Sequence, residues 1–95
     1  MKTLPDNVAM YKRTPQFTSL STPAGLLDNH TTKVGVWAKI NVEKGTIEYT
    51  INNGKTYLLT EDIHGIIEPQ IPHYIKPSHD AEFFIEFYRV PETSP

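Results

Sequence analysis

The chain contains no cysteine, which excludes disulfide bonds, thiolate metal sites and a cysteine nucleophile. No run approaches the roughly 18 apolar residues that a membrane-spanning helix needs. Lysine and arginine are not clustered along the sequence, and the formal net charge of −2 gives no general attraction to nucleic acid or anionic lipid. The first residues, from Met1 to Asp6, lack the apolar core of a signal peptide. We therefore expect a soluble, cytoplasmic protein with no nucleic-acid partner and no membrane.

Proline and glycine, in contrast, are frequent for the length of the chain. Eight prolines and five glycines among 95 residues favour short strands and tight turns over long helices. This length fits a single domain. We expect that domain to span residues 1–95, with an irregular N-terminal arm over about residues 1–24 and a frayed tail over about residues 91–95.

Two stretches alternate between apolar and polar residues with the period of a β-strand. The first runs from Val34 to Val42 and the second from Thr46 to Ile51. Gly45 allows a turn between them. The segment Asn-Asn-Gly at residues 52–54 predicts a hairpin, because Asn-Gly tolerates the positive φ of a type I′ turn. Residues 55–60 are then the partner strand.

Three further strands are expected in the second half of the chain, over residues 66–69, 73–76 and 82–90. In the last of these, Phe83, Ile85 and Phe87 share one face, and Glu86 lies on the other. We expect no helix. Short strands separated by turns at roughly 8 to 12 residues are typical of a sandwich or a jelly roll.

Several motifs together resemble a known family. The stretch from Gly45 to Ile51, the Asn-Gly turn, and the Glu-Pro-Gln segment at residues 68–70 before His73 are similar to a small cupin. The pattern H-x-T-K-x-G-x-W-x-K, which begins at His30, is more specific and resembles the TehB/YeaR-like family. The resemblance covers roughly residues 8–90. It implies an all-β fold, a small cupin-like jelly roll (double-stranded β-helix) barrel.

That family comprises small stand-alone cupin-like proteins and the N-terminal domain of some tellurite-resistance methyltransferases. The resemblance therefore implies a metal-binding protein associated with resistance to tellurite or another oxyanion, or with stress response. The chain departs from the pattern at Thr32, which stands where a cupin has its second histidine, so the usual site of three histidines and one glutamate is absent. No glycine-rich cofactor loop follows a strand, so methyl transfer by this chain alone is not expected.

His30 and His73 are the candidate metal ligands, because a small barrel can bring such distant positions together and neutral imidazole binds zinc, iron, nickel and copper. Asp28 lies two residues before His30 and would share its face on a strand. Glu86 could be a further ligand, or fix a histidine tautomer, if its face of the last strand lines the cavity. We expect a divalent metal, zinc or iron. Alternatively, each histidine bonds to a backbone carbonyl and only caps a strand.

Two other functions stay open. The chain could be a metal-dependent enzyme acting on a small polar substrate, although the sequence assigns no catalytic residue beyond the histidine and carboxylate site. It could instead be a non-catalytic module that senses a ligand, such as a small molecule or an oxyanion, or that serves in interaction with a partner. A short barrel also needs its sheet edges covered, either by pairing with a second copy or by the N-terminal arm, and we expect a homodimer.

Overall fold

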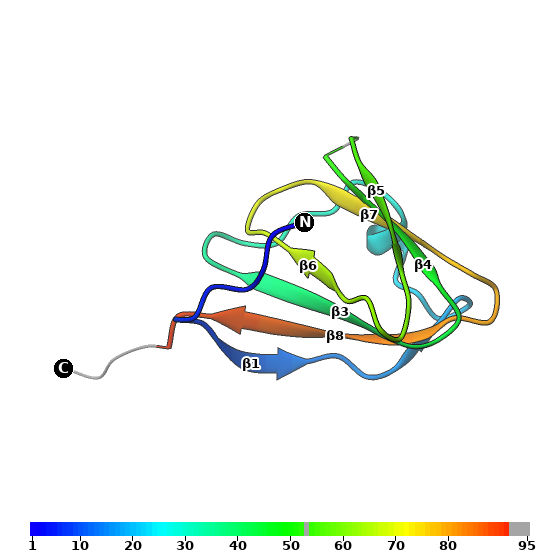
Figure 1. Ribbon diagram of the computed structural model, residues 1–95, viewed down its shortest axis with the longest axis horizontal. Coiled ribbons are helices and arrows are strands. Elements are labelled where there is room, and N and C mark those ends of the chain that lie inside the picture. Colours follow the sequence, from blue (N-terminus) through cyan, green and yellow to red (C-terminus); the bar gives the residue numbers. More distant parts are fainter. Residues whose placement is uncertain (53, 92–95) are drawn as a thin grey trace.

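The computed structural model of the protein describes residues 1–52 and 54–91, which form two antiparallel sheets. The larger sheet holds, in spatial order, β1 (Ala9–Arg13), β8 (Glu82–Arg89), β3 (Trp37–Lys44) and β6 (Gly65–Ile67), and β2 (Phe17–Thr18) also pairs with β8. The smaller sheet holds, in order, β5 (Thr56–Leu59), β4 (Ile47–Ile51) and β7 (His73–Pro77). A 3₁₀ turn, η1 (Ala24–Leu27), precedes β3. Figure 1 shows the smaller sheet crossing over one end of the larger sheet. This architecture confirms the predicted fold, a small all-β barrel of the jelly-roll type.

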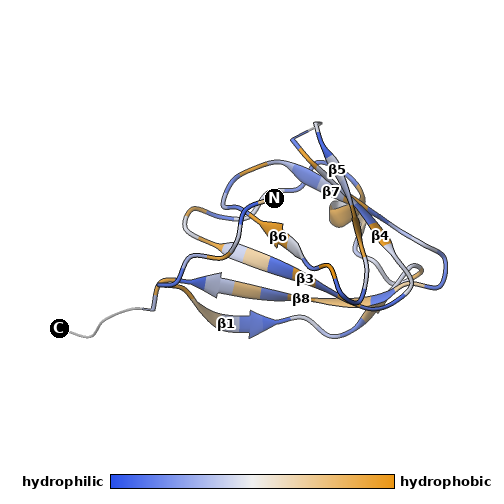
Figure 2. Ribbon diagram, in the orientation of Figure 1, coloured by the Kyte–Doolittle hydropathy of each residue, from blue (hydrophilic) through white to orange (hydrophobic). Residues whose placement is uncertain are grey.

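The core lies between the two sheets and is built mainly from alternate residues of the strands β3 to β8. In β3, Ala38, Ile40 and Val42 are buried, and Phe83 and Ile85 are buried beside them in β8. The smaller sheet contributes Ile47, Tyr49, Leu59 and Ile75 to the same core. Figure 2 shows hydrophobic and hydrophilic segments alternating along β3 and β8. The period-two pattern of the sequence therefore predicted the inward face of β3 correctly.

The strand predicted from residue 34 begins later in the structure. Val34 is 75% exposed and lies in a turn closed by a hydrogen bond from Val36 N to Lys33 O at 3.0 Å. Gly35, in the same turn, has a φ of +74°, which is outside the range of a strand. The ladder with β8 consequently starts at Trp37.

The N-terminal arm, expected to be irregular, contains β1 and β2, which both pair with β8. Every residue of β1 is exposed, so no alternation marks this strand in the sequence.

The predicted hairpin is confirmed, because β4 pairs with β5 from Ile47 opposite Leu59 to Thr50 opposite Thr56. Asn53 of its turn, and residues 92–95 of the expected frayed tail, lie outside the described residues. Within the described part of the chain, no helix has the length and apolar character needed to cross a membrane.

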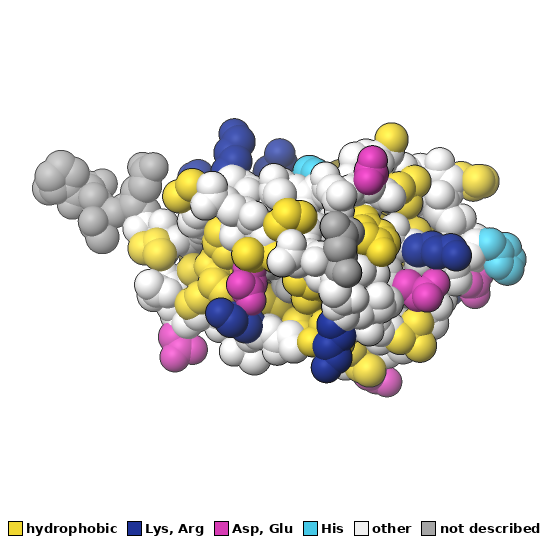
Figure 3. Space-filling model, turned by 90° about the horizontal axis from the view of Figure 1, so that it is seen from above, with side chains coloured by type: hydrophobic (Ala, Val, Ile, Leu, Met, Phe, Trp, Pro, Cys, Tyr) yellow, Lys and Arg dark blue, Asp and Glu magenta, His cyan; other side chains and the backbone are white. Residues whose placement is uncertain are grey.

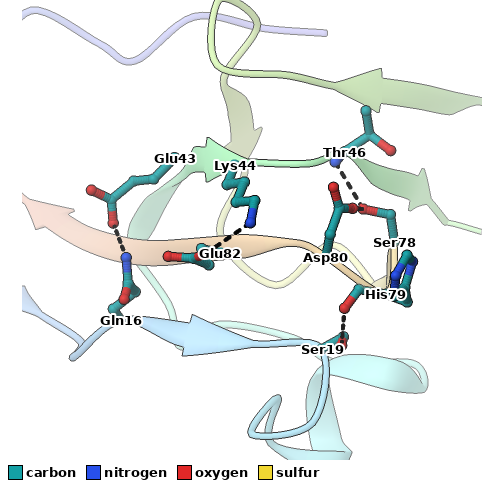
Figure 4. Close-up of polar contacts among 9 residues, drawn as sticks. All are labelled: Gln16, Ser19, Glu43, Lys44, Thr46, Ser78, His79, Asp80 and Glu82. Atoms are coloured by element: carbon teal, nitrogen blue, oxygen red, sulfur yellow. Dashed lines mark hydrogen bonds and ion pairs between the residues drawn. The ribbon is translucent and has the colours of Figure 1, made fainter.

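One end of the barrel is closed where the turn after β3 meets the turn after β7 (Figure 4). Ser78 N donates to Thr46 O at 2.8 Å, and Thr46 N donates to Ser78 Oγ at 3.0 Å. Ser78 Oγ donates in turn to Asp80 Oδ1 at 2.7 Å, and this bond holds the pKa of the Asp80 carboxyl below its usual value. Gly45 packs against this turn so closely that a Cβ atom there would lie 2.6 Å from Ser78 Oγ and 2.9 Å from Ala81 Cα.

Replacing Gly45 by alanine should lower the free energy of unfolding by about 3 kcal/mol, because the positive φ costs about 1 kcal/mol and overpacking adds about 2 kcal/mol. Gly35→Ala is the matched control, since the two φ angles are +73° and +74° but nothing lies within 4 Å of a Cβ at Gly35. The control should lose only about 1 kcal/mol. Urea unfolding followed by circular dichroism measures both variants, and equal losses would contradict the steric account.

Candidate functional site

A backbone bridge joins two histidines that lie 43 positions apart in the sequence. His30 N donates to His73 O at 2.7 Å, and His73 N donates to His30 O at 2.9 Å. The pair is an isolated antiparallel bridge on one edge of β7, whose other edge pairs with β4. Residues directly opposite each other in an antiparallel pair place their side chains on one face. The two imidazole rings accordingly meet edge to face, with their centroids 5.5 Å apart.

His73 is a core residue with only 1% of its surface exposed. Its ring packs against the ring of Tyr49 with a centroid separation of 5.9 Å. The Tyr49 hydroxyl donates to Ile66 O at 2.8 Å and so ties β4 to the segment that forms β6. Burial raises the pKa of this hydroxyl, which therefore stays protonated. Tyr49 is thus a fixed wall of the site and not a free acid or base.

The tautomer of His73 follows from the hydrogen bond that its ring makes. Nδ1 lies 3.1 Å from Ile71 O, and because a carbonyl oxygen only accepts, we assign the proton to Nδ1. Burial lowers the pKa of His73 and outweighs the hydrogen bond to Ile71 O, which raises it; the nearby His30 lowers this pKa further. The ring is therefore neutral at pH 7, and its Nε2 carries a lone pair.

This Nε2 atom is buried and has no hydrogen-bond partner among the described residues. Leaving a buried acceptor unpaired costs about 1–3 kcal/mol. Such atoms are rare in native proteins, and a bound ion or ligand is one reason for their presence. An imidazole whose Nδ1 is held by a carbonyl and whose Nε2 is free is also the form that binds a metal ion or accepts a proton from a ligand.

The loop that carries His30 is anchored by Thr32. Gln70 N donates to Thr32 O at 3.2 Å, and Thr32 Oγ1 donates to Val36 O at 2.7 Å. Gln70 itself adopts a φ of +62° to make this contact. Thr32 is thus a buried structural residue, and it fixes the loop beside the β6–β7 connection.

The two predicted carboxylates are not brought to the histidine pair. Asp28 is exposed, and its Oδ1 accepts a hydrogen bond from Asn29 N at 2.8 Å. Glu86 lies on the outer face of β8, where its Oε1 accepts a hydrogen bond from Asn41 Nδ2 at 2.9 Å. Across residues 1–52 and 54–91, no three or more His, Asp or Glu side chains come together as a metal-binding group. A metal at this site would therefore have two imidazole ligands from the described residues.

His30 also lines an open cavity of about 440 Å³. The walls of this cavity come from β1, from the loop at residues 30–36 and from β8. Three cations line it, Lys12, Lys33 and Arg89. On the face seen in Figure 3, Lys and Arg side chains gather at the upper edge beside a histidine. His30 thus lies between the buried ring of His73 and a cationic cavity, which we call the basic cavity.

Comparison with known proteins assigns the family. The model of the TehB-like domain matches residues 12–85. Two curated proteins named "Probable S-adenosyl-L-methionine-dependent methyltransferase TehB", from Haemophilus influenzae strains 10810 and ATCC 51907, are 34% and 33% identical over 85 residues. Each alignment covers 82% of this chain and 30% of the relative. The chain belongs to the TehB-like family.

Two solved structures share the fold. A protein from E. coli (strain K12) superposes with a TM-score of 0.87 over 97% of this chain and 100% of its own, at 24% identity. TehB from Haemophilus influenzae superposes with a TM-score of 0.81 at 30% identity, over 90% of this chain and 32% of its own. The chain therefore spans about a third of the length of the TehB proteins that it matches.

The cations of the basic cavity were missed by reasoning from the sequence. Lys12, Lys33 and Arg89 are far apart in the chain and meet only because β1 pairs with β8 and the bridge holds the loop in place. One signal was available, since Lys33 is part of the H-x-T-K pattern that begins at His30.

The pH dependence of stability tests the buried, neutral state of His73. The pKa of His73 is lower in the folded chain than the ordinary value of about 6.5, so the unfolded chain takes up a proton that the folded chain refuses. Above about pH 6.5, His73 should not lower the free energy of unfolding. This free energy should decrease as the pH drops from there towards the pKa of His73 in the folded chain. The expected loss is about 1.4 kcal/mol for each unit between the two pKa values.

Urea unfolding in EDTA at about pH 7.5 and about pH 5.5 measures this loss. His73→Asn should lose much less than the wild type, because its amide can still donate to Ile71 O but does not titrate. His79→Gln, at an exposed position, is the control and should lose as much as the wild type. An equal loss in His73→Asn would contradict the assignment.

Proposed function

We propose that this TehB-like chain is a small binding protein in which His30 and His73 hold a divalent metal ion, zinc or iron. The observation that carries the proposal is the buried Nε2 of His73, which lacks a partner among the described residues. Nδ1 carries the proton that is donated to Ile71 O, so Nε2 of the neutral ring is deprotonated. A nitrogen that binds a metal ion must be in this state. The two histidines therefore supply side chains of the kind that bind zinc and iron.

His30 would supply the second ligand. Its ring already meets the ring of His73, and the backbone bridge holds both in register. The chain has no cysteine, and Asp28 and Glu86 bond elsewhere, so the remaining ligands would be water or a small molecule. A donor set of imidazoles suits zinc, iron, nickel and copper. When bound, the ion would act as a Lewis acid that attracts anions.

A small oxyanion is the ligand that we expect at such an ion. Two protein ligands leave coordination positions open, and an anion is the natural occupant of an open position on a divalent cation. The link to resistance against tellurite or another oxyanion follows from the family resemblance and is part of this proposal, as are the cupin relationship and a cytoplasmic location.

Binding, and not methyl transfer, is the role that we assign to this chain. The longer relatives carry the name of a methyltransferase, but this chain corresponds to 30% of their length. No glycine-rich cofactor loop follows a strand in the present sequence. A metal-dependent reaction on a small polar substrate is the alternative, and it would require the substrate to reach an open position on the ion.

A homodimer is proposed as well. β1 is the outermost strand of the larger sheet, and all of its residues are exposed, the apolar Met10 among them. Native proteins commonly cover or blunt such an edge. Light scattering should therefore give about twice the chain mass of 10.8 kDa, and the mass of a single chain would contradict this expectation.

Elemental analysis of protein purified without a tag tests the metal. The wild type should carry about one ion per chain, and His30→Gln and His73→Asn should each lose it, because each removes one of the two imidazoles. His73→Asn keeps a donor for Ile71 O, so an unchanged circular dichroism spectrum separates metal loss from unfolding. His64→Gln, an exposed histidine outside the site, is the matched control and should keep the ion.

Calorimetric titration with zinc chloride compares the zinc affinity of the wild type with that of the same histidine variants at equilibrium. A wild-type protein that purifies without metal and binds no zinc at micromolar concentration would overturn the proposal. Equal metal content in the wild type and in the His30→Gln/His73→Asn double variant would overturn it too.

A further inference from the structure

The basic cavity is lined by positive charge, whereas the chain as a whole has a negative net charge. Three of the nine Lys and Arg residues line it, although the net charge of the chain is −2. No acidic side chain is among its lining residues in the described part of the chain. The ion pairs formed among residues 1–52 and 54–91 involve Lys2 and Lys44, and none involves Lys12, Lys33 or Arg89. This concentration of positive charge is therefore available to a ligand.

A β-bulge in β1 builds one wall of the cavity. The ladder pairs Met10 with Tyr88 and then Lys12 with Phe87, so Tyr11 is an extra residue in β1. Neighbouring residues of a regular strand point to opposite faces. Here the bulge lets Tyr11 and Lys12 line the same cavity. Bulges re-aim side chains in this way and are over-represented beside functional sites.

Aromatic rings orient two of the cations without neutralising them. The guanidinium carbon of Arg89 lies 4.0 Å from the ring centroid of Tyr11, and Lys12 Nζ lies 6.0 Å from that of Phe87. A ring face attracts a cation but carries no net charge, so the positive charge still acts on an anion. The planar fork of Arg89 is suited to two oxygen atoms of a carboxylate or phosphate group.

Lys33 is placed by the loop that carries His30. Its carbonyl oxygen accepts a hydrogen bond from Val36 N at 3.0 Å, which closes the turn at Gly35. Thr32, the preceding residue, is anchored to the β6–β7 connection by Gln70 N. The third cation therefore comes from a segment whose backbone is held on both sides.

The size of the cavity and its apolar wall select the kind of anion. Its volume of about 440 Å³ lies in the range of sites for organic molecules. An inorganic oxyanion such as phosphate has about five heavy atoms, and at about 30 Å³ for each of them it would fill only about a third of this volume. Val36, Phe87 and Tyr11 offer apolar surface beside the cations. We propose that the basic cavity binds an organic anion, a carboxylate or phosphate group on a flat apolar body.

Isothermal titration with phenyl phosphate in low-salt buffer tests this proposal. The protein is kept metal-free with EDTA, so that the cavity is tested separately from the histidine pair. Phenyl phosphate should bind at submillimolar concentration, and phenol and inorganic phosphate should each bind about tenfold more weakly or not at all. Added salt should weaken the binding, because the cations are exposed.

Matched variants locate the binding. Lys33→Gln and Arg89→Gln should each weaken phenyl phosphate about fivefold, which is the upper range for one exposed charged contact. Lys76→Gln is the control, since Lys76 is an exposed lysine on the outer face of β7, and it should leave the affinity unchanged. Amide shifts of residues 31–33 on addition of phenyl phosphate should report the same site.

The possible outcomes are distinct. Equal weakening by Lys76→Gln would mean that the charge of the chain and not the cavity attracts the anion, and this would overturn the proposal. If inorganic phosphate binds as tightly as phenyl phosphate, the claim that the cavity prefers an organic anion would be overturned. Binding that appears only after zinc is added would assign the anion to the metal, which would overturn the basic cavity but support the metal site.

Discussion

The two backbone hydrogen bonds between His30 and His73 are the constraint on which the candidate site depends. They join positions 43 residues apart and place both imidazoles on one face of the bridge. The same bridge holds the loop at residues 30–36 beside β1 and β8, so that Lys33 reaches the basic cavity. The buried histidine and the cationic surface are therefore two consequences of one backbone contact.

Two neighbouring polar side chains in the core show where this fold differs from a purely structural barrel. Tyr49 is buried, but its hydroxyl donates to Ile66 O and is satisfied. His73 is equally buried, yet its Nε2 has no partner among the described residues. An apolar side chain at this position would avoid a cost of about 1–3 kcal/mol. The contrast directs attention to His73 and not to Tyr49 as the functional group.

The alternation in β3 and the Asn-Gly turn after β4 predicted an all-β fold, a sandwich or a jelly roll, and the family resemblance selected the barrel. The barrel in turn predicted that the two histidines meet. β1 could not be predicted, because its residues are all exposed and only pairing with β8 makes it a strand. Glu86 could not be placed, because aromatic residues occur on both faces of β8 and the sequence does not say which face is inward. The meeting of Lys12, Lys33 and Arg89 depends on a bulge and a bridge, which are features of tertiary pairing.

The proton on the ring of His73 tests the central claim most directly. Nuclear magnetic resonance spectra that correlate ring nitrogens with ring protons, recorded on metal-free protein labelled with ¹⁵N, distinguish the two neutral tautomers from the charged ring. At neutral pH the account predicts a proton on Nδ1 and an unprotonated Nε2 whose resonance changes when zinc is added. A proton on Nε2, or a charged ring at neutral pH, would contradict it, because no lone pair would then face a ligand.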